Sequence, residues 1–210
     1  CVRTLRENII SLDLEPGAPF NDVEMSQMIG ISRTPVREAV IQLSEESRII
    51  EIFPQRGMRI ALIDVDLVEE ARFLRLVLEK AAVELVCGQA DEEDLQWLDE
   101  NIRLQEFYLE GGSSRKLLEL DNEMHRKLFS ICRKELTYEM CQRLAIHYDR
   151  IRSLSVAAVK DHKIIEDHKK LLEAIRSRDK KLAAETMDLH LNRWMLNEQM
   201  FRDQYPAYFK

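Results

Sequence analysis

Four side chains that can bind a metal ion lie in the second half of the chain. Asp121 and His125 are four residues apart, so on a helix they would lie one turn apart on the same face and could share a ligand. His168 and His190 follow, each among apolar residues at helical spacing. Three imidazoles and one carboxylate that converge in a helical core suit a zinc, nickel, manganese or similar divalent ion, with one coordination position open to water or a ligand carboxylate.

The competing interpretation of these four residues is structural. A single histidine in a helix is more often a packed or exposed residue than a metal ligand. The spacing alone does not establish that three helices bring the side chains together.

A second candidate site lies at the start of a short helix near residue 34. Thr34 is a good N-cap, and Pro35 suits the first helical position. The apolar residues on one face of this helix are Val36, Ala39, Val40 and Leu43. Thr34 and Arg37 point away from that face, and Arg33 lies at the exposed N-terminus, where an arginine can bind guanine O6 and N7 by two hydrogen bonds. Taken alone, the pattern also describes a solvated helix with exposed arginines.

Two further helices are predicted before this helix, and the second of them forms a motif with it. Leu5, Ile9 and Ile10 line one face of an opening helix. Asn21 can cap a second short helix, which Gly30 can end in the left-handed conformation. Two short helices joined by a tight turn that contains glycine form a helix-turn-helix.

A β-hairpin is expected directly after the motif. Residues 50–53 and 58–61 alternate in polarity, with Gln55 and Arg56 at the tip and Gly57 permitting the bend. The residues expected to face inward are Ile50, Ile52, Met58 and Ile60. A basic hairpin tip beside a recognition helix is typical of a wing that approaches the phosphates or minor groove of DNA.

The remainder of the chain is predicted to be a bundle of helices. Residues 63–205 contain no proline, and apolar residues recur there at three and four positions. Six helices are expected, at residues 64–88, 91–111, 114–132, 135–159, 161–177 and 179–201. The short joints imply antiparallel neighbours. The predicted fold is mainly α, with a winged helix-turn-helix in residues 1–62 and an all-α antiparallel helical bundle in residues 63–210.

The composition excludes several classes of protein. The chain has 210 residues, of which 45% are hydrophobic and 33% charged, and only 6 are glycine and 5 proline, so disordered and collagen-like chains are excluded. Stretches without a charge are too short to span a bilayer, so no membrane partner is expected. The 4 cysteines include no CxxC pair, and no leader is recognisable, so a cytoplasmic protein is expected.

The charge balance limits how the chain could bind nucleic acid. The net charge of -7 excludes a wholly basic nucleic-acid coat. DNA binding would depend on arginines placed on one surface, namely Arg33, Arg37, Arg56 and Arg59.

The segment Leu14–Leu43, with the string SRTPVREA from Ser32, resembles the N-terminal DNA-binding domain of GntR-family bacterial transcription regulators. The resemblance covers Val2–Ala61. It implies that Arg33, Thr34 and Arg37 contact DNA and that Gly57 holds the wing tip against it. The family often has a glycine ahead of the wing, where this chain has Ser44–Arg48, so the first wing strand is expected to enter differently.

Residues 63–201 resemble the helical ligand-binding domain (FCD) of the FadR-type subfamily of these regulators. The spacing of the aspartate and the three histidines matches the metal-binding members of that subfamily. The resemblance implies that Asp121, His125, His168 and His190 bind a divalent metal. His147 and His162 do not match, and they are expected to be structural or exposed.

The same resemblance implies a small organic acid as effector, held by the ion and by basic side chains. Arg75 stands where the first helix of such domains often has a pocket arginine, and Arg150 and Arg152 are further candidates. The alternative for all three is an ordinary ion pair, such as Arg75 with Glu79 at four residues' spacing.

The sequence therefore predicts a ligand-responsive transcription regulator, a repressor and not an enzyme, that binds a double-stranded DNA operator as a homodimer. One alternative is a metal-dependent hydrolase with an accessory DNA-binding domain, in which Glu166 or Asp167 would serve as the base. Another is a helical interaction module without a small ligand.

Overall fold

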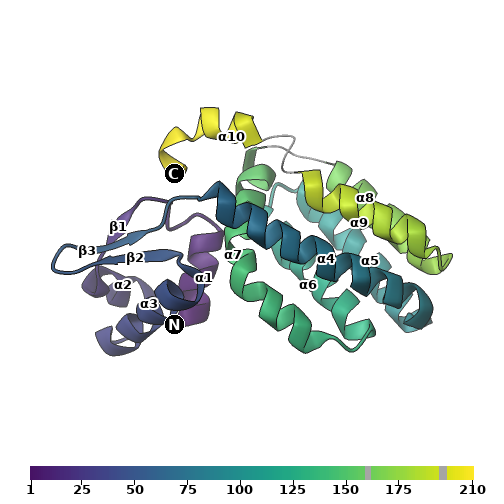
Figure 1. The fold of residues 1–210 in the computed structure, drawn as a ribbon, viewed down its shortest axis with the longest axis horizontal. Helices are drawn as coiled ribbons and strands as arrows, with labels where there is room; N and C mark the ends of the chain where they lie inside the picture. The colour runs from purple at the N-terminus through teal and green to yellow at the C-terminus, as the bar shows by residue number, and fades with distance from the viewer. Residues whose placement is uncertain (159–161, 194–197) are drawn as a thin grey trace. The chain divides into compact units, whose positions relative to one another are not determined.

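The computed structural model describes residues 1–158, 162–193 and 198–210, which form helices and a small sheet (Figure 1). They group into two compact units. Unit 1 comprises Cys1–Ala71, Arg143–Ile151 and Gln199–Lys210, and unit 2 comprises Arg72–Gln142 and Arg152–Glu198. Two long helices, α4 (Val65–Gln89) and α7 (Glu135–Ala158), contribute residues to both units.

Unit 1 begins with the helices α1 (Val2–Ile10), α2 (Asp22–Ile29) and α3 (Arg33–Ser47). The ends of α2 are set by the predicted local signals. The side-chain oxygen of Asn21 accepts hydrogen bonds from the amides of Val23 and Glu24 at 3.0 and 2.9 Å, and Gly30 ends the helix with a φ of 75°. Because only a short turn joins α2 to α3, the two form the predicted helix-turn-helix.

The predicted N-cap of α3 at Thr34 is wrong. The helix begins at Arg33 after the N-cap Ser32, so Pro35 takes the third helical position. Proline is tolerated there because amides of the first turn have no partner within the helix. At the other end Arg48 has a φ of 55°, a conformation usually supplied by glycine. The chain thus enters the wing without the glycine that is common in the family.

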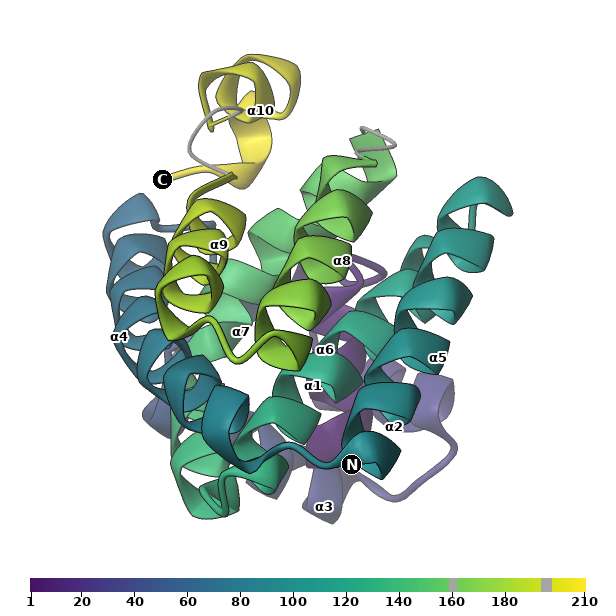
Figure 2. The same cartoon turned by 90° about the vertical axis from the view of Figure 1, so that its right-hand side faces the viewer.

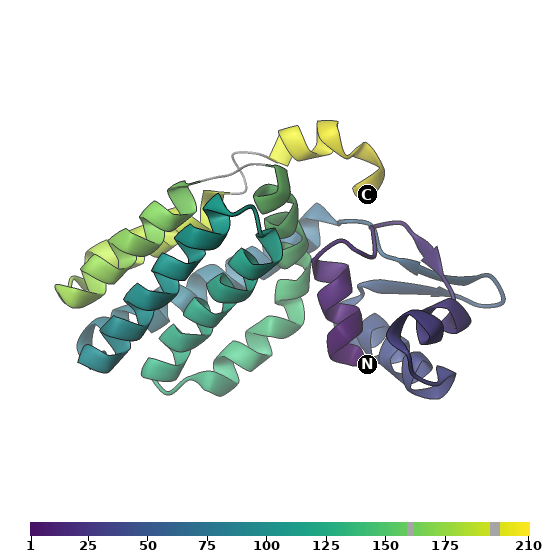
Figure 3. The same ribbon diagram turned by 180° about the vertical axis from the view of Figure 1, so that it is seen from behind.

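The wing belongs to a three-stranded antiparallel sheet of order β1-β3-β2 (Figure 3). The strands are β1 (Pro19–Phe20), β2 (Ile50–Phe53) and β3 (Gly57–Ile60). β2 and β3 form the predicted hairpin, and Gln55 and Gly57 at its tip have φ values of 61° and 99°. The sequence does not predict β1, which pairs with the other edge of β3.

The hairpin contacts the core only at its base. Ile50 and Ile60 are buried in the apolar core of unit 1, and Met58 packs against its edge. The prediction that Ile52 faces the core is wrong, because its side chain is 44% exposed. Strand alternation fixes the face on which a side chain lies, but not how far the core extends beneath it.

The middle of α7 supports the winged helix-turn-helix. Ile146 is buried in the same core, Nε2 of His147 lies 2.6 Å from the carbonyl oxygen of Ser47, and Arg150 donates a hydrogen bond of 2.6 Å to the carbonyl of Ala61. Because a carbonyl only accepts, Nε2 of His147 carries the proton. Burial, with a smaller contribution from Arg150, lowers the pKa of His147 to about 4. His147 is therefore a neutral, structural residue.

Unit 2 is a helical bundle (Figure 2). Its other helices are α5 (Glu92–Glu110), α6 (Ser114–Ile131), α8 (Lys163–Arg176) and α9 (Lys180–Asn192). α5 packs against α6 and α8, and α8 packs against α9. Asp91 and Asp94 form a capping box at the start of α5, Gly111 is the C-cap of that helix, and Asp179 caps α9. These ends agree with the sequence prediction.

The predicted last helix, residues 179–201, corresponds to α9 and to α10 (Glu198–Gln204) on either side of residues 194–197. Residues 194–197, and the predicted helix ends at Val159 and Asp161, lie outside the described residues. A short 3-10 helix, Pro206–Tyr208, follows, and Phe209 forms a β-bridge with Ile63. These elements confirm the predicted mainly α fold. No described helix combines the length and apolar character needed to cross a bilayer.

Candidate metal centre and DNA-binding surface

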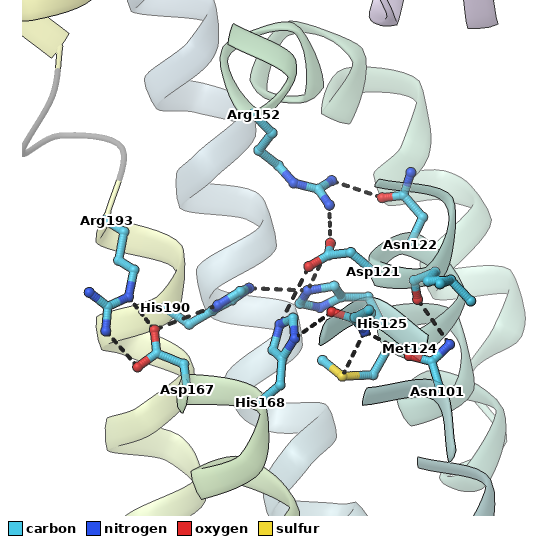
Figure 4. Close-up of polar contacts among 12 residues, drawn as sticks. Asn101, Asp121, Asn122, Met124, His125, Arg152, Asp167, His168, His190 and Arg193 are labelled. Atoms are coloured by element: carbon cyan, nitrogen blue, oxygen red, sulfur yellow. Dashed lines mark hydrogen bonds and ion pairs between the residues drawn. The ribbon is translucent and has the colours of Figure 1, made fainter. Parts of the chain in front are cut away.

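The four predicted metal ligands converge inside unit 2 (Figure 4). Asp121 and His125 lie one turn apart on α6, His168 lies on α8 and His190 lies on α9. One ligand atom from each lies within 4.8 Å of all the others. Three of the residues are buried and His190 is partly buried. These four residues form a cluster that could bind a metal ion.

Two of the distances between donor atoms of the cluster match those around one small ion. Nε2 of His190 lies 3.3 Å from Nε2 of His125, and Nε2 of His168 lies 3.4 Å from Oδ1 of Asp121. Donor atoms about 2.0 to 2.2 Å from a tetrahedral zinc ion lie roughly 3.3 to 3.6 Å from one another. His125 and His168 turn Nε2 toward the carboxylate of Asp121, and His190 turns Nε2 toward Nε2 of His125. Lone pairs that face each other at such distances repel unless a proton or a cation lies between them.

A chain of hydrogen bonds fixes the tautomer of His168. The side-chain nitrogen of Asn101 donates to the carbonyl of Leu120 at 3.1 Å, so its oxygen is the atom that accepts from Gln105 at 2.7 Å. This fixes the amide of Gln105, whose oxygen lies 2.8 Å from Nδ1 of His168. Nδ1 must therefore carry the proton, and Nε2 keeps the lone pair that a metal requires.

A carboxylate holds the outer nitrogen of His125. Oε2 of Glu79 lies 2.5 Å from Nδ1 of His125, and Oε1 of Glu79 accepts a hydrogen bond of 2.6 Å from Arg75. Burial alone would raise the pKa of Glu79, but Arg75 and His125 outweigh it and lower the pKa to about 2. The ionised carboxylate favours a proton on Nδ1 of His125, which again leaves the lone pair of Nε2 directed into the cluster.

A carboxylate of α8 lies near the outer nitrogen of His190, at a distance too long for a hydrogen bond. Oδ2 of Asp167 lies 3.8 Å from Nδ1 of His190, and Oδ1 of Asp167 accepts a hydrogen bond of 2.7 Å from Arg193. Asp167, considered from sequence as the base of a hydrolase, is thus engaged by an arginine and lies beside the outer face of a histidine.

The protonation states of the cluster are those that a divalent ion requires. Burial would raise the pKa of Asp121, but Arg152 and the three histidines lower it well below its usual range. Burial lowers the pKa of His168 to about 4, and burial and the neighbouring imidazoles lower that of His190 well below its usual value. At neutral pH the carboxylate is therefore ionised and these two imidazoles are neutral.

The three predicted effector arginines lie in different places. Arg152 hydrogen-bonds Asp121 and, at 2.8 Å, Asn122, with its side chain 13% exposed. Arg75 is buried and forms the expected ion pair with Glu79, which in turn contacts His125. Arg150 belongs to unit 1, where it holds the backbone after the wing. The structure brings Arg75 and Arg152 to the cluster and gives Arg150 a structural role.

Sequence reasoning did not identify Gln105 as part of this site. Its signal is a fully buried polar side chain on the apolar face of α5, between Ile102 and Leu109. A buried amide needs hydrogen-bond partners, so its position pointed to a polar neighbour from another helix.

Replacing Gln105 with Met should weaken zinc binding about 10- to 100-fold, because the side chain keeps its volume but no longer fixes the tautomer of His168. Competition with a chromophoric chelator measures the affinity, and thermal melts report the fold. Gln96→Met makes the same change at an exposed position of α5 and should leave the affinity unchanged. Equal affinities for the two folded variants would show that the Gln105 hydrogen bond does not support the site.

The residues predicted to contact DNA from the recognition helix are exposed on the first turns of α3. The side chains of Arg33 and Arg37 are 55% and 61% exposed, and Thr34 is also exposed. The opposite face of the helix is buried in the core, as the sequence predicts. The N-terminus of α3 thus presents two guanidinium groups to solvent, and the side chain of its N-cap, Ser32, forms no capping hydrogen bond.

The wing residues differ in how they are held. Arg56 is exposed at the tip beside Gly57. Arg59 is paired with Glu51 on the adjacent strand and lies over the ring of Phe53. Of the wing arginines, Arg56 is therefore the better placed for contact with DNA.

A winged helix-turn-helix followed by a helical unit is the architecture of a class of DNA-binding transcription regulators. The model of the bacterial regulatory proteins of the gntR family matches residues 2–60, and the FCD domain model matches residues 70–193. The chain belongs to the GntR family and to its FadR-like subfamily with a C-terminal FCD domain.

Known proteins resemble the chain over nearly its whole length. The HTH-type transcriptional repressor RspR of Escherichia coli (strain K12) is 28% identical over 208 residues, which cover 99% of this chain and 91% of that protein. The structure of E. coli McbR/YncC matches with a TM-score of 0.82 at 20% identity, covering 97% of this chain and 96% of that one. A putative regulator from Rhodococcus sp. RHA1 matches with a TM-score of 0.74 at 19% identity, covering 91% and 92%.

The names of these relatives argue against the alternative that the chain is a hydrolase. The relatives are named as transcription regulators, not as enzymes, and the chain is a DNA-binding regulator of the same family.

Proposed function

We propose that the chain is a cytoplasmic, homodimeric repressor of transcription. Its affinity for a DNA operator would rise or fall when a small organic acid binds beside a metal ion in the FCD domain. Residues 1–62 would bind DNA, and residues 63–210 would bind the effector and form the dimer. The observation that carries the proposal is the cluster of Asp121, His125, His168 and His190 in a family whose other domain binds DNA.

The metal would be held by the four residues of the cluster. Three imidazoles and a carboxylate suit zinc or nickel, and manganese also accepts this donor set. A bound ion would supply positive charge and an open coordination position to an anionic ligand. Glu79, Gln105 and Asp167 would keep the imidazoles in the orientation that presents Nε2.

Arg152 and Arg75 support an acidic effector. Arg152 contacts a proposed metal ligand, Asp121, and is only slightly exposed, so a carboxylate that reaches the ion would meet a guanidinium beside it. Arg75 lies behind Glu79 and stabilises its charge. Arg150 is left out of the proposed effector site because its contacts lie in unit 1.

The proposed DNA contacts are Arg33, Thr34 and Arg37 from the recognition helix and Arg56 and Gly57 from the wing. One recognition helix reads only a short half-site, so a homodimer with two helices and a pseudo-palindromic operator is expected. Two pairs of exposed apolar side chains on unit 2, the members of each pair one helical turn apart, support dimer formation, because a partner often covers exposed apolar surface. They are Phe73 and Val77 on α4 and Leu136 and Met140 on α7.

The name of RspR supports a repressor, since that relative is a transcriptional repressor. An effector can change DNA binding only as far as it binds one arrangement of the protein better than the other.

Selection of operators from a pool of random duplexes tests the proposal. We expect enrichment of an inverted repeat with half-sites about one helical turn apart. Adding small carboxylic acids to the metal-loaded protein should change the operator Kd about 5- to 150-fold for at least one acid. A pool that yields no preferred sequence would contradict the proposal. Measurable metal-dependent turnover of the acids or their esters would favour the hydrolase instead.

A further inference from the structure

One acidic side chain lies among the arginines of the recognition helix. Asp22 is the first residue of α2 and is buried to 9% exposure. Its Oδ2 accepts from Nε and Nη2 of Arg33 at 3.2 and 3.1 Å, and from Nε of Arg37 at 2.5 Å. A single buried carboxylate thus holds both arginines that are proposed to contact DNA.

These ion pairs contribute little to the stability of the fold. Both guanidinium groups are more than half exposed, and exposed pairs are weakened by water and salt. Their main effect is on conformation. A long arginine side chain has many rotamers, and a fixed carboxylate that accepts hydrogen bonds from its guanidinium group restricts them before any ligand binds.

The edge of Arg33 that Asp22 holds is not the edge that reads a base. Nε and Nη2 face the carboxylate, so the edge formed by Nη1 and the second proton of Nη2 points elsewhere. That edge is able to donate two parallel hydrogen bonds to O6 and N7 of guanine. In Arg37 only Nε donates to Asp22, which leaves both terminal nitrogens to other acceptors.

The carboxylate is charged under the conditions in which it would act. Burial would raise the pKa of Asp22, but the hydrogen bonds and charges of Arg33 and Arg37 lower it. A fixed negative charge at this surface also repels phosphates, and phosphate attraction supplies most of the non-specific affinity of DNA-binding proteins.

We propose that Asp22 is a positioning residue for sequence recognition: it holds Arg33 and Arg37 with their base-reading edges outward and limits non-specific attraction to the DNA backbone. The inference rests on the proposed DNA-binding surface and adds a determinant of specificity outside the recognition helix. The proposal predicts that removing the charge of Asp22 weakens specific binding and strengthens non-specific binding. Unfolding of the domain would weaken both.

The test compares Asp22→Asn with Glu24→Gln, which removes the same charge from an exposed position of α2. Affinities of the full chain for its selected operator and for an unrelated duplex are measured over a range of salt concentrations. For Asp22→Asn we expect tighter binding to the unrelated duplex and weaker binding to the operator. The specificity ratio, which is the affinity for the operator divided by the affinity for the unrelated duplex, should be about tenfold lower. Glu24→Gln should leave the ratio unchanged.

A double-mutant cycle separates positioning from a structural role. If Asp22 acts through Arg37, Asp22→Asn should lower the ratio less in an Arg37→Ala background than in the wild type. A parallel loss of both affinities with a lower Tm, or a ratio equal to that of Glu24→Gln, would overturn the role of Asp22.

The single arginine variants distinguish failure of this inference from failure of the DNA-binding surface. If Arg33→Ala and Arg37→Ala both keep the wild-type specificity ratio, these arginines do not form the DNA-binding surface, and the proposed role of Asp22 is contradicted as well. If they lower the ratio and Asp22→Asn does not, only the role of Asp22 is contradicted.

Discussion

Replacing His168 and His190 together with alanine is expected to abolish metal binding by the chain. The change removes two of four donors from a cluster whose ligand atoms lie within 4.8 Å of one another. For the wild type, a metal present at 100 times its Kd should stabilise the folded state by about 2.7 kcal/mol. For a chain of this size that corresponds to a rise in Tm of roughly 5 to 10 °C. The double variant should show no rise and only background metal in elemental analysis.

The matched control is His162→Ala, an imidazole that is 54% exposed and lies outside the cluster. It should keep the metal content and the metal-dependent rise in Tm of the wild type. Equal metal content in the double variant and the control would place any ion elsewhere in the chain.

Replacing Arg37 with alanine should weaken operator binding about 5- to 150-fold for each half-site, the loss expected when one two-bond contact to guanine is removed there. Arg37 is 61% exposed on a helix whose opposite face is buried, so the variant should remain folded. Binding to an unrelated duplex should fall much less, because it depends on the total charge near the phosphates. Binding titrations with both duplexes at one salt concentration measure the difference.

Arg3→Ala provides the control for charge. Arg3 is 89% exposed on α1, and its removal lowers the net charge by the same amount. If Arg37→Ala and Arg3→Ala reduced operator affinity equally, charge alone would explain the loss and the recognition helix would be misassigned.

Features with local signals could be predicted from the sequence. Asn21 and Gly30 set the ends of α2, and Asp91 and Gly111 those of α5, because caps depend on the side chain at one position and the conformation of its own backbone. The start of α3 was harder to place, because Ser32 and Thr34 are both common caps and Pro35 is tolerated anywhere in the first turn.

Features that depend on distant contacts could not be predicted. β1 has two residues and exists only because β3 offers an edge. Ile146 follows the apolar spacing of α7, yet nothing near it in sequence indicates that it joins the core of the winged helix-turn-helix. The exposure of Ile52 likewise depends on where that core ends.

The candidate metal site shows the same division. Its four candidate ligands have residue types that suit a divalent ion, and the cluster forms as the resemblance to metal-binding members of the subfamily implies. The residues that contact these candidate ligands from behind are harder to predict from the sequence. The spacing indicates Glu79 only as a local partner of Arg75, and its contact with His125 forms only because α4 packs near α6 in the folded chain. Arg150 and Arg152 are two residues apart in one helix, but their contacts lie in different units.

The most direct test of the proposed function measures how the acid, the metal and DNA depend on one another. The operator Kd is determined for the metal-loaded wild type and for the His168→Ala, His190→Ala double variant, each with and without the most active acid of the panel. The account predicts a shift of about 5- to 150-fold in the wild type and none in the double variant. An equal shift in both proteins, or no shift with any acid in the wild type, would contradict the proposal that this cluster senses the effector.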